Sequence, residues 1–272
     1  MKRLFKVELS RSLTSKSMFT ALIIGLIIVI AQVFQDVIPM ARLIDEGLKY
    51  NKPMVFPGSA FMHWLSQSNS METSLYYMIL PILATIPFAD SFFTDRKSGY
   101  IKNVLIRAKK KDYYISKYMA TFISGGLAVV IPLIVSFLIT SMILPSMLPE
   151  VTNGGVFPTS IWSKLFYTNP YFYVLGYLII DFLFSGFIAT IALSVSLIAD
   201  YRFAVLIAPF LIYIFIYSLG MSLGITDYQP YFFLQSCGVF NSSFSVIFIE
   251  MVGLGAITSS TFLIKGVKED IY

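Results

Sequence analysis

Long apolar stretches, separated by short charged clusters, restrict what this chain can fold into more than any other feature. A bilayer core is crossed by about 20 helical residues, and in lipid each backbone N–H and C=O must be paired within its own segment. The chain is 57% apolar and only 13% charged, whereas about a quarter of the residues in a soluble domain are charged. It lacks the alternating segments of about ten residues that indicate a transmembrane barrel. These patterns predict an all-α protein that crosses a bilayer several times.

We expect one membrane domain over residues 1–272 with six transmembrane helices. The first apolar run, Met18–Phe34, has no small-residue cleavage site behind it, which favours an uncleaved span over a signal peptide. The turn Asp200–Arg202 is too short to hold a domain and makes spans four and five an antiparallel hairpin. The predicted spans cover approximately residues 18–34, 73–89, 119–143, 171–199, 203–223 and 242–264.

Lysine and arginine are distributed unequally between the two sides of this six-span arrangement. Sixteen of them lie before span one, between spans two and three, between spans four and five, and after span six. Only four, Arg42, Lys49, Lys52 and Lys164, lie on the other side. Cytoplasmic loops carry the excess of basic residues, so both termini are expected in the cytoplasm. Basic residues beside apolar spans also argue against nucleic acid as the reason for the net charge of +5.

The loop between spans two and three is the most informative segment for function. Within it, Asp95–Arg107 is predicted to form one short helix, with an acidic start and a basic end that suit the helix dipole. The apolar side chains fall on one face at helical spacing, and the basic side chains fall largely elsewhere. The apolar set is Tyr100, Ile101, Val104 and Leu105; the basic set is Arg96, Lys97, Lys102 and Arg107. Such a helix could offer one face to a partner, whereas the simpler interpretation is a solvated basic linker.

The order of residues in this loop resembles the first cytoplasmic loop of ABC-2 type permeases, the membrane subunits of one class of ATP-binding-cassette transporters. The layout of the whole chain is also similar, with a basic N-terminal segment, six spans and a tight turn between spans four and five. The motif itself covers about Phe92–Lys117. The residues that carry the resemblance are Phe93, Asp95, Arg96, Gly99, Tyr100, Ile101, Leu105, Ile106 and Lys117.

This resemblance implies a set of roles and partners. Asp95–Arg107 would be a coupling helix that docks on a separate ATPase subunit, which would carry the ATP and magnesium. Lys2–Ser15 would be an amphipathic connecting helix at the inner surface of a bacterial cell membrane. Two permease chains and two ATPase chains would form the working exporter. The docking residues would be Asp95, Arg96, Gly99, Tyr100, Ile101, Val104, Leu105 and Arg107, and the membrane-facing side of the connecting helix would be Leu4, Phe5, Leu9 and Leu13.

Two acidic residues, Asp181 and Glu250, fall inside predicted spans. A charge at mid-bilayer costs about 2.5–3.5 kcal/mol on insertion scales, so such residues usually face the protein interior or water. They are candidates for a substrate path or a proton-linked site, and the alternative is hydrogen bonding in helix packing. For Asp181, Tyr177 and Ser185 are candidate partners one turn away on the same helix. The pairs Gly125-Gly126 and Ser185-Gly186 are expected to allow close helix packing.

Other chemistry is poorly represented. The chain has no G-x-x-x-x-G-K-[ST] phosphate loop, so we expect no ATP site in it. A lone histidine, His63, and a lone cysteine, Cys237, do not suffice for a metal site, and Cys237 is expected to be a buried or interfacial residue. No nucleophile arrangement supports an enzyme. The leading hypothesis is therefore the membrane subunit of an ATP-driven exporter for an amphipathic or hydrophobic substrate (peptide, lipid or drug). The alternatives are a secondary transporter or channel using Asp181 and Glu250, and a non-transporting scaffold or sensor.

Overall fold

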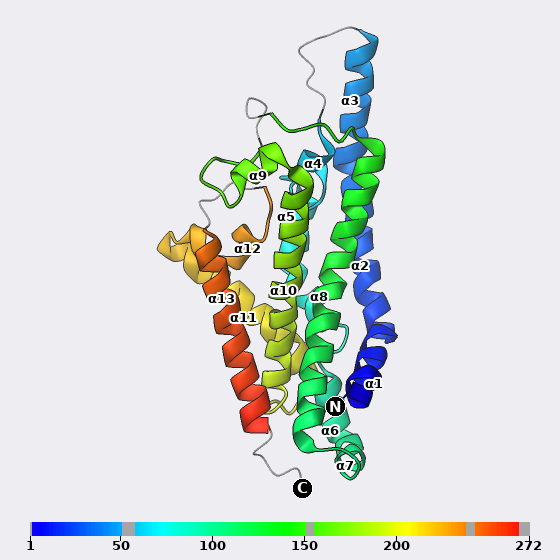
Figure 1. Ribbon diagram of the computed structural model, residues 1–272, viewed down its shortest axis with the longest axis vertical. Coiled ribbons are helices and arrows are strands. Elements are labelled where there is room, and N and C mark those ends of the chain that lie inside the picture. The colour runs from blue at the N-terminus through cyan, green and yellow to red at the C-terminus, as the bar shows by residue number, and fades with distance from the viewer. Residues whose placement is uncertain (1, 51–57, 151–154, 238–242, 267–272) are drawn as a thin grey trace.

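The fold is an elongated bundle of long helices, seen in a computed structural model that describes residues 2–50, 58–150, 155–237 and 243–266. These residues contain helices and connecting segments but no strand. The long helices alternate in direction, so that α2, α8 and α11 run up in Figure 1 and α5, α10 and α13 run down. Their bounds are α2 Lys16–Gln32, α5 Met71–Thr85, α8 Lys110–Ile143, α10 Pro170–Val195, α11 Arg202–Leu223 and α13 Phe244–Ser259.

Shorter helices lie at the two ends of the bundle. At the end that we call basal, shown at the bottom of Figure 1, lie α1 (Lys2–Leu13), α6 (Ser91–Lys97) and α7 (Tyr100–Leu105). The opposite, distal end holds α3 (Ile38–Lys49), α4 (Ala60–His63) and α9 (Ser163–Thr168). The short helices η3 (Thr226–Tyr228) and α12 (Pro230–Phe233) follow α11, and the π-helical segment η4 (Ser260–Lys265) continues α13.

Five helical stretches are long and apolar enough to cross a membrane: Lys16–Lys49, Lys110–Ile143, Pro170–Val195, Arg202–Leu223 and Phe244–Ile264. The chain therefore has the character of a multi-pass membrane protein. Two predicted boundaries are wrong. The first helix does not stop at Phe34, because the π-helical segment η1 (Val33–Val37) joins α2 to α3 without a break, and α8 begins at Lys110 instead of Met119.

The predicted second span is α5, which has only 15 residues. At 1.5 Å per residue it is about 22 Å long, shorter than a hydrocarbon core of about 30 Å. It packs against α2, α8, α10 and α11, and Tyr76, Tyr77 and Leu80 on it are fully buried. Neighbouring helices, instead of lipid, thus surround much of α5.

The main core extends through the middle and distal part of the bundle and is rich in aromatic rings. Phe166, Tyr173, Tyr177 and Trp64 belong to it. Phe166 and Tyr173 are both fully buried, because the polypeptide around α9 folds back over the start of α10. The Tyr173 hydroxyl donates a hydrogen bond to the Ser236 carbonyl oxygen at 2.6 Å. Cys237 is buried, as predicted.

Helices α8 and α10 are the most extensively packed pair in the bundle, and small residues allow their close approach. A Cβ added to Gly125 would lie 2.4 Å from the Ala189 Cβ, and one added to Gly186 would lie 2.8 Å from the Phe122 ring. Real Cβ atoms are essentially never this close to another heavy atom. The structure thus confirms the predicted role of the glycines in close helix packing.

We predict that Gly125→Leu lowers the thermal unfolding temperature of the detergent-solubilised chain, because the new side chain would push α8 away from α10. Gly253→Ala is the matched control, since a Cβ at Gly253 meets no heavy atom within 4 Å. The measurement is fluorescence-detected thermal unfolding. An equal unfolding temperature for both variants would show that the α8–α10 contact does not depend on Gly125.

Candidate functional site

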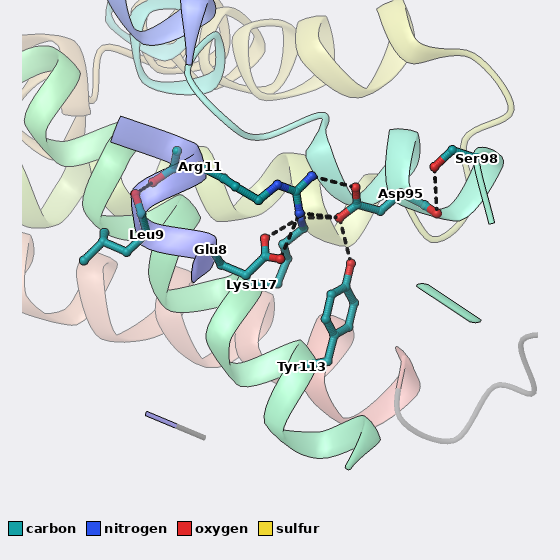
Figure 2. A network of polar contacts seen from close by, with 8 residues as sticks. Glu8, Leu9, Arg11, Asp95, Ser98, Tyr113 and Lys117 are labelled. Carbon is teal, nitrogen blue, oxygen red and sulfur yellow. Dashed lines mark hydrogen bonds and ion pairs between the residues drawn. The ribbon is translucent and has the colours of Figure 1, made fainter. Parts of the chain in front are cut away.

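A buried group of charged side chains joins three helices at the basal end. Lys117 of α8 is fully buried, and its Nζ lies 2.8 Å from Glu8 Oε2 of α1 and 2.6 Å from Asp95 Oδ2 of α6. Arg11 of α1 contacts the same two carboxylates, at 2.9 Å for Glu8 Oε1 and 3.0 Å for Asp95 Oδ1. Figure 2 shows the four side chains converging. We call Glu8, Arg11, Asp95 and Lys117 the basal ion network.

Helical periodicity explains how the sequence brings these groups together. Glu8 and Arg11 are three residues apart in α1 and therefore lie on one face of it. Tyr113 and Lys117 are four residues apart in α8, and both point toward α6. The Tyr113 hydroxyl donates to Asp95 Oδ2 at 3.0 Å. Asp95 thus accepts hydrogen bonds from two other helices and is the centre of the network.

The network is electrically balanced, with two cations and two carboxylates. Burial alone would raise the pKa of Asp95, but the hydrogen bond from Arg11 and the charge of Lys117 outweigh it and hold that pKa below its ordinary value of 3.8. The Phe88 ring adds cation–π contacts with both cations. Its centre lies 4.5 Å from Lys117 Nζ and 5.9 Å from the Arg11 guanidinium carbon. A buried network of this kind holds together only while all its members are present.

Helix α6 is also attached to the turn between α10 and α11. Arg96 donates to the Leu197 carbonyl oxygen at 3.1 Å, and Lys97 donates to the Asp200 carbonyl oxygen at 3.0 Å. Arg202 at the start of α11 pairs with Asp90, immediately before α6. The seven residues of α6 are therefore bonded to α1, to α8 and to the α10–α11 turn.

The predicted single helix over Asp95–Arg107 is instead two helices, α6 and α7, separated by Ser98 and Gly99. Gly99 has φ +72°, a left-handed conformation that favours glycine. This turn lets α7 fold back beside α6. The charge and apolar patterns across Gly99 therefore belong to two separate helix surfaces.

The fold-back buries much of the predicted docking face inside the chain itself. Asp95 and Ile101 are buried, and Val104 and Leu105 pack with Phe92 and Phe262 in a basal apolar cluster. Tyr100 stacks on Arg11, 4.8 Å from the guanidinium carbon to the ring centre. The exposed residues of this segment are Arg96, Lys97, Ser98, Lys102, Asn103, Ile106, Arg107 and Lys109, with Ile106 82% exposed.

Helix α1 forms where the connecting helix was expected. The apolar side chains that were expected to face the membrane also pack on other parts of the protein. Leu4 packs on the basal apolar cluster, and Leu13 packs beside Met18 and Ala21. Phe5 and Leu9 are half-buried. The most buried residues of α1 are the polar Glu8 and Ser12. The basal ion network, more than an apolar face, therefore holds α1 in place.

The two acids predicted within spans occupy different environments. Asp181 is fully buried, and its Oδ2 accepts a hydrogen bond from the Tyr77 hydroxyl of α5 at 3.1 Å. Its Oδ1 has no partner among the described residues. The prediction that Ser185 pairs with the Asp181 carboxylate was wrong, because the Ser185 hydroxyl donates to the backbone oxygen of Asp181 instead. Glu250 is half-buried near the margin of the bundle.

A second polar cluster, at the distal end, went unnoticed in the sequence. His63 Nδ1 lies 3.1 Å from Asp36 Oδ1, and Ser68 Oγ donates to Asp36 Oδ2 at 2.7 Å. The buried Gln32 donates to the His63 carbonyl oxygen. Asp36 sits in the π-helical segment η1, which turns it toward α4. In the described ranges no group of three or more His, Cys, Asp or Glu residues is arranged to hold a metal.

Comparison with known proteins assigns the chain to a family. The family described as "Protein of unknown function (DUF2705)" matches residues 25–252. The chain belongs to this family. The match begins within α2 and ends within α13, so it covers the bundle, whereas Glu8 and Arg11 lie before it. No curated protein and no solved structure matches this DUF2705 chain.

Removing Lys117, the central cation of the basal ion network, should destabilise the folded protein. We predict that Lys117→Met lowers the free energy of unfolding by about 3–5 kcal/mol, because it leaves Glu8 and Asp95 buried with only Arg11. Lys97→Met is the control, since its Nζ is exposed and bonds only to a backbone oxygen. Chemical denaturation in detergent measures the difference. Combining Lys117→Met with Asp95→Asn should recover part of the loss, and strictly additive losses would show that the two charges are not coupled.

The lowered pKa of Asp95 gives its contribution to stability a definite pH dependence. Its ionised form is favoured in the folded state, so the stabilisation is complete above the unfolded pKa of about 3.9 and is lost as the pH falls through the lower folded pKa. We predict that Asp95→Asn is less stable than the wild type at pH 7 and loses less stability between about pH 5 and pH 2. Parallel pH curves for the two proteins would contradict this.

Proposed function

We propose that this DUF2705 protein is the membrane subunit of an ATP-driven exporter, with a separate ATPase bound at its basal end. The basal end would face the cytoplasm, consistent with the basic residues concentrated there. Two copies would assemble in the cell membrane with two ATPase subunits. The cargo would be amphipathic or hydrophobic, and the ATP and magnesium would be bound by the partner.

The arrangement of α5 supports a bundle with six crossings. This helix runs antiparallel to α2 and α8 and lies between α4 at the distal end and α6 at the basal end (Figure 1). Its limited length is acceptable because surrounding helices, instead of lipid, cover most of it. With α5 counted, both ends of the described chain lie on the basal side.

The observation that carries the proposal is the attachment of α6 to three other elements. Asp95 binds Arg11 of α1 and Lys117 of α8, while Arg96 and Lys97 bind the α10–α11 turn. A displacement of α6 and α7 would therefore be transmitted at the same time to α1, to α8 and to the α10–α11 turn. A solvated basic linker does not need a fully buried lysine or bonds to three elements.

The exposed residues of α7 and of the turn after it provide a surface for the ATPase. Four side chains here are exposed to the surroundings of the bundle: Lys102, Asn103, Ile106 and Arg107. Among them Ile106 is a large apolar side chain that is almost fully exposed. An apolar side chain among basic ones suits a partner groove with an acidic rim. Closure of the ATPase pair would move α6 and α7, and the bundle would respond by rigid-body rearrangement of its long helices.

Co-purification with the ATPase encoded by a neighbouring gene tests the proposal. We predict that Ile106→Asp and Arg107→Glu each weaken the association at least tenfold, a change of about 1.4 kcal/mol. Lys164→Glu, an exposed charge reversal in α9 at the distal end, should leave it unchanged. The absence of any associated ATPase, or equal association of all three variants, would refute the proposal.

A secondary transporter remains the rival function, because one buried carboxylate oxygen of Asp181 has no partner in the part of the chain that the structure describes. Under the exporter proposal, Asp181→Asn keeps the hydrogen bond from Tyr77 and leaves transport dependent on ATP. Under the rival, the same change abolishes proton-driven uptake. Transport in proteoliposomes, energised either by ATP with the partner or by a proton gradient, distinguishes the two.

A further inference from the structure

A cavity of 280 Å³ lies between α10, α11 and α13. Its walls are mainly apolar and aromatic, and Phe184, Ile188, Tyr213, Ile216 and Leu254 are among the lining residues. Helices α11 and α13 are the least buried of the five membrane-length stretches, so the cavity lies near the outer margin of the bundle. This position makes it accessible from the surrounding lipid, while Phe184, Ile188 and Tyr213 join its inner wall to the main core.

One lining residue does not match the rest. Glu250 carries a carboxylate, and among the described residues no side chain pairs with it by hydrogen bond or ion pair. The buried acids Glu8 and Asp95 both have cationic partners, and Asp181 has Tyr77. An ionised group at membrane depth is costly when its charge is not compensated. The charge of Glu250 is therefore complementary to a cation that the chain itself does not supply.

The aromatic walls suit the same kind of ligand. Phe184 and Tyr213 both line the cavity, and aromatic faces attract cations, more strongly when water is excluded. The Tyr213 hydroxyl donates its proton to the Tyr77 carbonyl oxygen at 3.1 Å, so that proton is not available to an anionic or polar ligand. The remaining lining favours an apolar body.

We propose that this cavity binds an amphipathic cation, a molecule with an apolar body and one quaternary or protonated amine whose charge pairs with Glu250. The inference rests on the proposed exporter function in that it names the class of cargo. The binding itself requires neither ATP nor the ATPase. A failure of this inference and a failure of the exporter proposal are therefore separable.

Equilibrium binding of tritiated tetraphenylphosphonium tests the site, with the full chain in lipid nanodiscs and empty nanodiscs as background. This probe is apolar and permanently charged, so changes in its protonation cannot contribute. We expect saturable binding that Glu250→Gln reduces at least tenfold and Glu250→Asp reduces less. Asp227→Asn, which removes an acid from η3 outside the cavity, should bind as the wild type does.

A second variant separates loss of the site from loss of the fold. Gly253 lines the cavity, and a Cβ added there meets no heavy atom within 4 Å, so Gly253→Leu can fill the space while Glu250 keeps its charge. We expect it to lose probe binding while its thermal unfolding temperature stays at the wild-type value or above. Dodecyltrimethylammonium should compete with the probe, and dodecanol should not.

Three results would overturn the inference. The first is probe binding that survives both Glu250→Gln and Gly253→Leu. The second is competition by dodecanol equal to that of dodecyltrimethylammonium. The third is the absence of saturable probe binding because a second copy of the chain covers the cavity. Probe binding without any associated ATPase would support this site and refute only the exporter proposal. Association of an ATPase without probe binding would do the reverse.

Discussion

The buried ammonium group of Lys117 is the constraint on which the basal half of the molecule depends. It is excluded from solvent and must be matched by carboxylates, and the two that match it come from α1 and α6, far apart in the sequence. Each carboxylate is in turn shared with Arg11. Loss of any one charge would leave the others buried and unbalanced. This requirement gives α6 one defined position against α8. Apolar contacts are less directional and would define that position less precisely.

Sequence patterns anticipated the general architecture because they report what the bilayer demands. Length and hydropathy located the long helices and placed most of their ends within a few residues, and Gly125 and Gly186 indicated close helix packing. The exceptions are the end of the first helix and the start of α8. The errors have a physical cause. Polar residues after Phe34 and before Met119 do not end a helix, since a helix may continue into water, and hydropathy cannot detect that continuation. Similarly, α5 could be short because protein covers it.

The candidate site was harder to anticipate, and the reason differs between residues. Arg11 was counted only as a charge that favours one side of the membrane, and Lys117 only as such a charge and as the end of the loop motif. Neither role shows which charge is buried. The stripe of Ile101, Val104 and Leu105 was expected to dock on a partner subunit, and in the structure it packs within the chain. Helical periodicity does not reveal whether the partner of an apolar stripe lies in the same chain. Gly99 was the available signal, because a glycine between two short patterns often marks a turn. The partners of Asp181 come from α5, so no local pattern contained them.

The continuous helix from Lys16 to Lys49 has a geometric consequence for the distal end of the protein. Its 34 residues extend about 51 Å, whereas the hydrocarbon core is about 30 Å thick. Its first turn is held beside the basal ion network, where the Ser15 hydroxyl both caps α2 and bonds to the Pro87 carbonyl oxygen. The excess of about 20 Å must therefore project on the distal side. The distal end of the bundle is thus supported by one continuous helix, which holds it at a distance from the hydrocarbon core.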